Sequence, residues 1–292
     1  MIPAGEPVTR RAAWWVALGL WAWAAPAAAL ELHPAMKADL GVSYWDEGLK
    51  LSATPGLQSD PLWGDPDSLL FGSTFLRLEV LAEATPSYAR LGPQIVFSPI
   101  AILEVSAHYL GSAYFGTFSS IKGFDDPGVV YTDELLDTRP RDAGLGTRWG
   151  GEATLQGKVG PVVVAAWGVV RRWDTFPGDG VEGSYFWEPQ AELLLAMHDW
   201  TWTVDGVVLY EHVFEAHAGR KLYVGGVFDR STSVESGDTY MRAGLLGNLS
   251  LNESWGVLLT VQPYLEDRVY TRPLPPYVAA RVRWTLAPPG EG

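Results

Sequence analysis

Apolar and polar residues alternate along most of the chain that follows the first thirty residues. In the segment 75–84, apolar side chains occupy every second position and charged side chains stand between them. The apolar set is Leu76, Leu78, Val80, Ala82 and Ala84, and the charged set is Arg77, Glu79 and Glu83. A period of two residues is typical of a β-strand with one apolar and one polar face. Because this alternation recurs down to the C-terminus and helical periodicity is almost absent, the pattern predicts an all-β protein.

The connections between the predicted strands are alternately short and long. Gly160-Pro161 and Asn252-Glu253-Ser254 are short breakers, whereas 117–143 and 174–199 are long stretches rich in Asp, Gly and Pro. Short periplasmic turns and long outer loops are typical of an antiparallel transmembrane β-barrel. A soluble β-sandwich or lipocalin-like barrel also alternates, but its strands are shorter and its outer face is polar. The sequence favours the transmembrane barrel over this soluble alternative.

The number of strands follows from where the chain begins and ends. Both termini are expected in the periplasm, so the number is even. We expect ten strands between 71 and 286, and the segment Ala38–Trp45 with Leu49–Ser52 can add a first hairpin. We favour twelve strands, with ten as the alternative. Residues 30–70 then form an N-terminal segment that holds this hairpin, 71–286 form the main barrel, and 287–292 form a tail.

The first 29 residues have the organisation of a secretory signal peptide. Arg10 and Arg11 precede an uncharged run over 12–29, in which Pro26 is followed by three alanines. A basic region, an apolar region and small residues at a cleavage site define such a signal. An N-terminal membrane anchor is the alternative, but the run is at the short limit for crossing a bilayer. We expect the mature chain to start near Leu30.

Composition removes several classes of function. The chain has no cysteine, a formal net charge of −13 and a charged fraction of only 19%. Disulfide frameworks and thiolate chemistry are therefore excluded, and the acidic balance argues against nucleic acid as a partner. Ser106 and His108 lie two apart on one strand face, in the reverse order and on the opposite face from the pair used by outer-membrane lipid hydrolases. We predict no enzyme activity.

The polar strand faces predict the residues of the barrel lumen. The expected lumen acids are Glu79, Glu83, Glu104, Glu152, Asp205, Glu211 and Glu266. The expected lumen bases are Arg77, Arg148, Lys158, Arg242, Arg268, Arg281 and Arg283, and Ser106 and His108 share this face. Buried charges require partners, and open porins have about 16–18 strands. A barrel of ten to twelve strands should therefore be filled by paired charges, which leaves at most a narrow channel.

Tryptophans on the apolar faces predict the borders of the membrane. We expect six of them to lie at the interfaces between lipid and water, where aromatic girdles flank the apolar band of such barrels. These are Trp149, Trp167, Trp173, Trp202, Trp255 and Trp284.

The stretch 174–199 is the most acidic of the loops. It contains six carboxylates and neither lysine nor arginine. The favoured interpretation is a loop that is simply charged and solvated. One functional alternative is that its charge repels anionic solutes from the mouth of the barrel. The other is a calcium site built from Asp174, Asp179 and Glu182, because calcium takes oxygen ligands in irregular geometry. No other cofactor is expected.

Over residues 71–286 the chain resembles the broad class of Gram-negative outer-membrane β-barrel proteins. The resemblance rests on the alternating segments, the rhythm of turns and a final amphipathic strand, 277–284, although the chain continues with Thr285-Leu286 and the tail. It implies residence in the outer membrane, with membrane lipid, lipopolysaccharide and the barrel assembly machinery as partners. No activity follows from the class alone. A narrow channel or transporter for small solutes is the first hypothesis. A non-conducting structural, adhesion or binding barrel that acts through its outer loops is the second.

Overall fold

The computed structural model describes residues 31–43, 48–64, 68, 70–117, 121–130, 135, 138, 142–179, 181–214, 220–267 and 276–286. The chain divides into two compact units, Met1–Leu32 and His33–Gly292. Only the last two residues of the first unit are described, so the expected signal peptide, 1–29, lies outside the described residues, as does the tail, 287–292. The second unit is a β-barrel.

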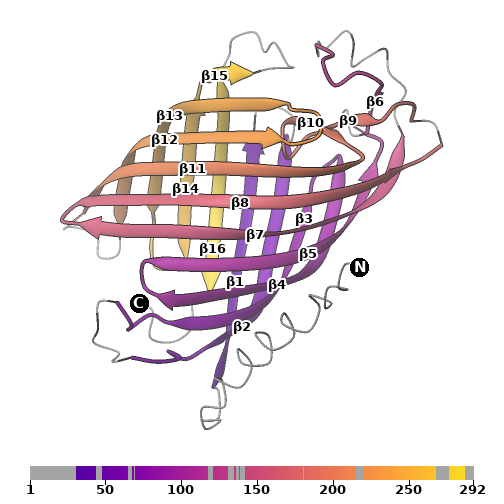
Figure 1. Cartoon of the computed structure of the whole chain (residues 1–292). Coiled ribbons are helices and arrows are strands. Elements are labelled where there is room, and N and C mark those ends of the chain that lie inside the picture. Colours follow the sequence, from indigo (N-terminus) through magenta and orange to yellow (C-terminus); the bar gives the residue numbers. More distant parts are fainter. Residues whose placement is uncertain are drawn as a thin grey trace, which may run out of the picture. The chain divides into compact units, whose positions relative to one another are not determined.

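The barrel wall is a single antiparallel sheet that closes on itself (Figure 1). In order around the barrel its strands are β1 (Leu32–Ser43), β2 (Leu49–Ser59), β3 (Phe75–Ala84), β4 (Tyr88–Ile100), β5 (Leu103–Phe115), β7 (Ala143–Val159), β8 (Val162–Pro177), β11 (His198–Val213), β12 (Lys221–Ser233), β13 (Thr239–Ser250), β14 (Trp255–Gln262) with its continuation β15 (Tyr264–Asp267), and β16 (Tyr277–Leu286). Since β14 and β15 form one strand interrupted at Pro263, the described wall has twelve strands. The ring closes where β1 pairs with β16, from Met36 opposite Leu286 to Ser43 opposite Ala279.

The favoured count of twelve strands is confirmed. The additional hairpin is longer than the sequence predicts, because β1 begins at Leu32 instead of Ala38 and β2 ends at Ser59 instead of Ser52. The β2–β3 ladder keeps one register on both sides of Pro55, from Ala53 opposite Ala82 to Gly56 opposite Glu79. Proline removes a backbone donor without ending the strand, which explains why the pattern appeared to stop before it.

The two ends of the barrel differ in their connections. At the end that we call the loop end, the long segments 116–142 and 178–197 join β5 to β7 and β8 to β11. At the opposite end, called the turn end, short turns join β4 to β5, β7 to β8 and β13 to β14. Long loops face outside and short turns face the periplasm in outer-membrane barrels, so the loop end is assigned to the extracellular side.

The outer face of the wall is apolar. Cross-strand partners point to the same face, and the register places a continuous set of exposed large apolar side chains outside. Members of this set include Leu40, Leu51, Leu78, Leu91, Val105, Leu155, Val164, Val208, Leu245, Leu259 and Val282. Water-soluble proteins do not expose apolar surface on this scale, whereas a lipid-facing band requires it.

Within the part of the chain that the structure describes, no helix combines the length and the apolar character needed to span a membrane.

One expected lumen residue changes side because the wall is irregular near Pro263. The register between β13 and β15 shifts, so that Arg242 lies opposite Tyr264 while Met241 lies opposite Glu266. The extra residue, Leu265, reverses the alternation. Glu266 was expected in the lumen but lies on the outer face, 3.8 Å from the Nη2 atom of Arg230. The other residue expected nearby, Arg268, lies outside the described residues.

Two lumen-facing glycines mark points where neighbouring backbones approach closely. A Cβ atom on Gly92 would lie 1.9 Å from the carbonyl oxygen of Tyr109, and one on Gly225 would lie 2.0 Å from that of Val208. Both obstructing atoms belong to backbone and cannot rotate away. Glycine at such positions allows the wall of a small barrel to bend sharply.

Gly92→Ala should therefore destabilise the barrel, by about 1–3 kcal/mol as for other overpacked sites. Gly168→Ala is the matched control, because a Cβ atom there has open space around it. Urea unfolding in lipid vesicles measures both changes, and heat-modifiable migration on gels reports the folded fraction. Equal stability of the two variants would contradict the close approach at Gly92.

Candidate functional site

A small β-hairpin from the most acidic loop packs inside the loop end of the barrel. The segment 178–197 forms β9 (Tyr185–Glu188) and β10 (Leu193–Ala196). They make a separate three-stranded sheet with β6 (Gly123–Phe124), which comes from the preceding loop. Figure 1 shows this sheet at one end of the barrel. We call residues 185–196 the inner hairpin.

The inner hairpin is apolar on both faces, and both faces are covered. Phe186, Leu193 and Leu195 pack against aromatic side chains of the wall. The aromatic partners are Tyr88, Tyr114, Trp173 and Tyr240. On the opposite face, Trp187 and Leu194 pack against Phe124. The hairpin is therefore held between the wall on one side and β6 on the other.

Two carboxylates, one from the connection between β12 and β13 and one from β11, also bind the hairpin backbone. Asp238 accepts a hydrogen bond from the amide of Leu194 at 2.7 Å, and Asp199 accepts one from the amide of Ala196 at 2.9 Å. Asp199 accepts a further bond from the hydroxyl of Ser233 at 2.6 Å. Buried backbone donors need such partners, so these acids fix the position of β10.

Glu188 begins the hairpin tip and forms a buried ion pair with the wall. Its carboxylate accepts hydrogen bonds from Nη2 of Arg90 at 2.8 Å and from the hydroxyl of Tyr114 at 2.7 Å. The side chains of Arg90 and Glu188 are both fully buried. The Arg90 guanidinium also lies 3.7 Å from the ring centroid of Tyr88. This arrangement pairs the charge and supplies aromatic contact, which a buried guanidinium requires.

Gln190, at the hairpin tip, joins two arginines and one acid of the wall. Its side-chain oxygen accepts hydrogen bonds from Arg90 and Arg148. Its side-chain nitrogen donates to Glu83 at 3.4 Å. Glu83 also pairs with Arg148 at 3.3 Å and with Lys50 at 3.6 Å. The hairpin tip is thus part of a network that reaches from β2 to β7.

Glu192 ends the hairpin tip and binds the opposite part of the wall. Its two carboxylate oxygens lie 2.9 and 3.0 Å from Nη1 of Arg242, and the hydroxyl of Tyr264 donates to it at 2.7 Å. Arg242 also donates to Asp229 through Nε at 3.0 Å. Glu192 has a φ of 53°, a conformation that is uncommon for residues other than glycine. The ion pair and the turn geometry together anchor this side of the tip.

The structure places most of the expected lumen residues in the lumen. By register, the set that faces inward is Arg77, Glu79, Glu83, Glu104, Ser106, His108, Arg148, Glu152, Lys158, Asp205, Glu211, Arg242, Arg281 and Arg283. Three local ion pairs form near the turn end. They join Arg77 to Glu79 at 2.8 Å, Lys158 to Glu211 at 2.5 Å, and Arg283 to Asp39 at 2.7 Å.

The sequence located Glu83, Arg148 and Arg242 in the lumen but did not single out the other residues that hold the hairpin. Arg90, Asp229, Glu188, Gln190 and Glu192 were not expected in the lumen. Arg90 and Asp229 lie on alternating strands and could have been found by extending the period-two pattern to 88–97 and 221–233. The three hairpin residues carry no comparable signal, because nothing in their sequence shows that a loop folds inward.

Ser106 and His108 lie on neighbouring inward positions of β5. Ser106 stands opposite Val96 and Glu152, and His108 opposite Gln94 and Gly150. The Nε2 atom of His108 is buried and has no hydrogen-bond partner among the described residues. No hydrogen bond joins the Ser106 hydroxyl to the His108 ring in the described part of the chain.

The tryptophans divide between the two faces of the wall. Trp149, Trp202, Trp255 and Trp284 face outward, with Trp255 and Trp284 directly opposite each other near the turn end. Trp173 was expected at a membrane interface, but it is buried in the lumen and donates to the hydroxyl of Thr201 at 2.9 Å. Trp167 also faces inward, opposite Asp205. β8 carries valine and alanine on both faces, so its alternation did not define which face is outside.

The acidic loop is only partly a solvated surface. Glu188 and Glu192 are neutralised by wall arginines, which lie far away in the sequence. Asp174 binds Nε of Arg172 at 3.2 Å and the ring of His198 at 3.0 Å, whereas Asp179 and Glu182 are exposed. A calcium site at Asp174, Asp179 and Glu182 stays a prediction.

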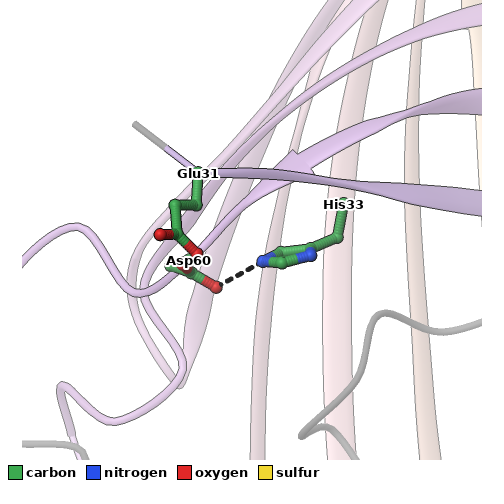
Figure 2. Close-up of side chains that lie close together, drawn as sticks. All are labelled: Glu31, His33 and Asp60. Carbon is green, nitrogen blue, oxygen red and sulfur yellow. Dashed lines mark hydrogen bonds and ion pairs between the residues drawn. The ribbon is translucent and has the colours of Figure 1, made fainter. Parts of the chain in front are cut away.

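One group of potential metal ligands lies together among the described residues. Glu31, His33 and Asp60 bring their ligand atoms within 4.8 Å of one another (Figure 2). Nε2 of His33 lies 2.8 Å from Oδ1 of Asp60, so these two groups satisfy each other. The three residues are exposed or half-buried, and such surface groups are common without a metal.

Four features of this barrel occur together in one class of membrane protein. They are the closed ring, the apolar outer face, the charged interior and the outward tryptophans near both ends. The fold is that of an outer-membrane β-barrel.

Comparisons with solved structures show similar architecture at very low sequence identity. The beta domain of the Bordetella autotransporter Brka is 10% identical, with 87% of this chain and 98% of that chain covered and a TM-score of 0.46. The translocator domain of the autotransporter NalP from Neisseria meningitidis is 13% identical, with coverages of 96% and 97% and a TM-score of 0.40. The outer-membrane protein OmpT of Vibrio cholerae is 8% identical, with coverages of 88% and 99% and a TM-score of 0.37. No protein-family model and no curated protein matches the chain.

Arg242→Ala should strongly destabilise this outer-membrane barrel. The change leaves Glu192 and Asp229 buried without their cation, and breaking a buried pair in this way costs about 3–5 kcal/mol. Arg281→Ala is the matched comparison, because Arg281 is exposed in the lumen and makes no ion pair within the described part of the chain. We expect its free energy of unfolding to stay close to that of the unmodified protein. Urea titrations in vesicles measure both, and equal losses would contradict this distinction.

Proposed function

We propose that the protein is a narrow channel for small solutes and that the inner hairpin forms its constriction. The observation that supports this most is the difference between the two halves of the lumen. The loop end is filled by the hairpin and its buried ion pairs. The turn end keeps lumen-facing polar side chains that are exposed to solvent.

The exposed lumen residues indicate a hydrated passage at the turn end. Lys37, Gln156 and Arg281 face inward by register and are nonetheless exposed. The side chains of Lys158 and Arg283 are 47% and 41% exposed although both form ion pairs. A barrel that served only as a rigid support would have no need for this space, because paired charges could fill it throughout.

The hairpin is too firmly held to act as a freely moving lid. Phe186, Trp187 and Leu193–Leu195 are all nearly inaccessible. Burying a large apolar side chain stabilises a protein by about 1.5–3 kcal/mol. Withdrawal of the hairpin would lose this stabilisation for all five side chains and would also break the buried ion pairs. Spontaneous withdrawal of the whole hairpin is therefore rare, and solutes pass beside it.

We assign the passage to the wall formed by β16, β1 and β2. The contacts described above for the hairpin run to strands from β3 round to β15. Lys37, Arg281 and Arg283, which are accessible to solvent, stand on β1 and β16. Membrane lipid, lipopolysaccharide and the barrel assembly machinery are the partners that this proposal includes. A non-conducting barrel that binds through its loops is the alternative.

In planar bilayers the purified protein should show small, discrete conductance steps. Replacing 185–196 by a short Gly-Ser linker should increase the conductance severalfold, because this change removes the constriction. Heat-modifiable migration on gels checks that the shortened protein still folds. No conductance in either protein, with both folded, would support the non-conducting alternative and refute the channel.

A single thiol tests the constriction without removing it. The chain has no cysteine, so Gln190→Cys places a unique thiol at the hairpin tip. A bulky thiol reagent should then reduce the current. Val234→Cys is the control, since Val234 is exposed beside β12 at the loop end and modification there should leave the current unchanged. Equal effects at both positions would show that the hairpin does not limit the flow.

A further inference from the structure

A small polar cavity lies at the turn end of the lumen. It has a volume of about 130 Å³ and lies between β13, β14, β16 and the turn 251–254. The lumen-facing residues that line it are Asn248, Ser250, Leu258, Arg281, Arg283 and Thr285. Its volume is several times the roughly 30 Å³ that one water molecule occupies in the liquid, so it has room for a small ion with polar groups.

Most of the polar side chains around this cavity have no protein partner. The side chains of Arg281, Asn248, Ser250 and Thr285 make no hydrogen bond or ion pair within the described part of the chain. All four can donate hydrogen bonds, and Arg281 carries a permanent positive charge. Elsewhere in this barrel, inward arginines such as Arg90 and Arg242 are fully engaged. The unengaged donors therefore converge on a space that the protein does not fill.

The charges around the cavity favour an anion. Arg283 is neutralised by Asp39, and Glu253 of the turn is among the residues that line the cavity. Two lysines adjoin the cavity through the register, since Lys37 pairs with Thr285 and Lys221 pairs with Ser250. Within the described lining, Arg281 is therefore the cation whose charge no carboxylate pairs, and Lys37 and Lys221 occupy neighbouring register positions.

We propose that Arg281, with Asn248, Ser250 and Thr285, forms a binding subsite for a small oxyanion. The planar guanidinium binds carboxylate and phosphate groups with two parallel hydrogen bonds, and the hydroxyl and amide groups supply further donors. The ligand class is a small molecule bearing a carboxylate or a phosphate. The inference names the solute class of the proposed channel, and in that step it rests on the proposed function.

The opposite wall supports this assignment. Glu104 and Glu152 face the lumen from β5 and β7, and β7 lies half-way around the barrel from β16. Their carboxylates form no ion pair among the described residues. Arg171 also faces the lumen from β8 without an ion pair in the described part of the chain, so two unpaired carboxylates outnumber one unpaired arginine on this wall. With Arg281 on the other wall, this distribution separates solutes by charge. An anion is thereby directed to the β16 wall, along the passage assigned above.

The same chemistry could be supplied from two sources, because Trp255 lies at the rim of the cavity and on the lipid-facing surface. A free anion would enter from the aqueous lumen, whereas a lipid headgroup would present its phosphate from the membrane. Titration of the protein in uncharged detergent separates them. Inorganic phosphate and succinate serve as free anions, and a short-chain phosphatidylglycerol serves as the lipid.

Isothermal titration should show saturable binding of a free anion to the unmodified protein. Arg281→Gln should weaken it by at least about tenfold, as expected for the loss of a charge-assisted hydrogen bond. Arg230→Gln is the matched control, because it removes the same charge from the outer face and should leave the affinity unchanged. Binding of phosphatidylglycerol alone would reassign the subsite to a lipid headgroup. Absence of binding for all three probes, or equal affinity in the two variants, would overturn the inference.

Conductance measurements keep this inference separate from the proposed channel. In a potassium chloride gradient, the reversal potential should shift towards cation preference in Arg281→Gln and not in Arg230→Gln. Saturable anion binding without any conductance would refute the channel and leave the subsite standing. A different outcome would refute the subsite and leave the channel standing. In that outcome both variants conduct with the same reversal potential, and Arg281→Gln binds the anion as tightly as the unmodified protein.

Discussion

Lipid offers no hydrogen-bond partner to the backbone, so every amide and carbonyl in the wall must be satisfied inside the protein. The pairing of β1 with β16 meets this requirement by removing the last two sheet edges. With only twelve strands the resulting ring is narrow. Long charged side chains that alternate into this ring are thereby withdrawn from bulk water. The need for partners among them governs the rest of the interior.

The barrel satisfies this need at the loop end by folding part of a loop into it. Arg90 and Arg242 lie on strands on different sides of the ring, and Glu188 and Glu192 reach them from the two ends of one hairpin tip. Buried ion pairs contribute little net stability, because desolvation offsets their attraction. Their geometry is demanding, however, and two of them fix where the tip lies. The apolar faces of the hairpin supply the stabilisation, and the charges determine its position.

The sequence predicted the wall well because alternation has a direct physical cause in the lipid. β3 and β13 carry charges on one face only. For these strands the sequence predicted both the position of the strand and which face points into the lumen. β8 carries apolar residues on both faces, so the alternation did not show that Trp173 points into the lumen. A bulge near Pro263 moved Glu266 to the outside, which strict alternation does not predict. The position of the hairpin depends on contacts between residues far apart in sequence, and these leave no periodic signal.

The strand pair that closes the ring also constrains the order of assembly. Met36 meets Leu286, so the seam joins the two ends of the barrel sequence. Contacts between such distant residues form late, because the chain must first lose the entropy of a very long loop. The strands that hold Glu188, Gln190 and Glu192 all precede β16. The hairpin can therefore enter a sheet that is still open, and the final strand then encloses it.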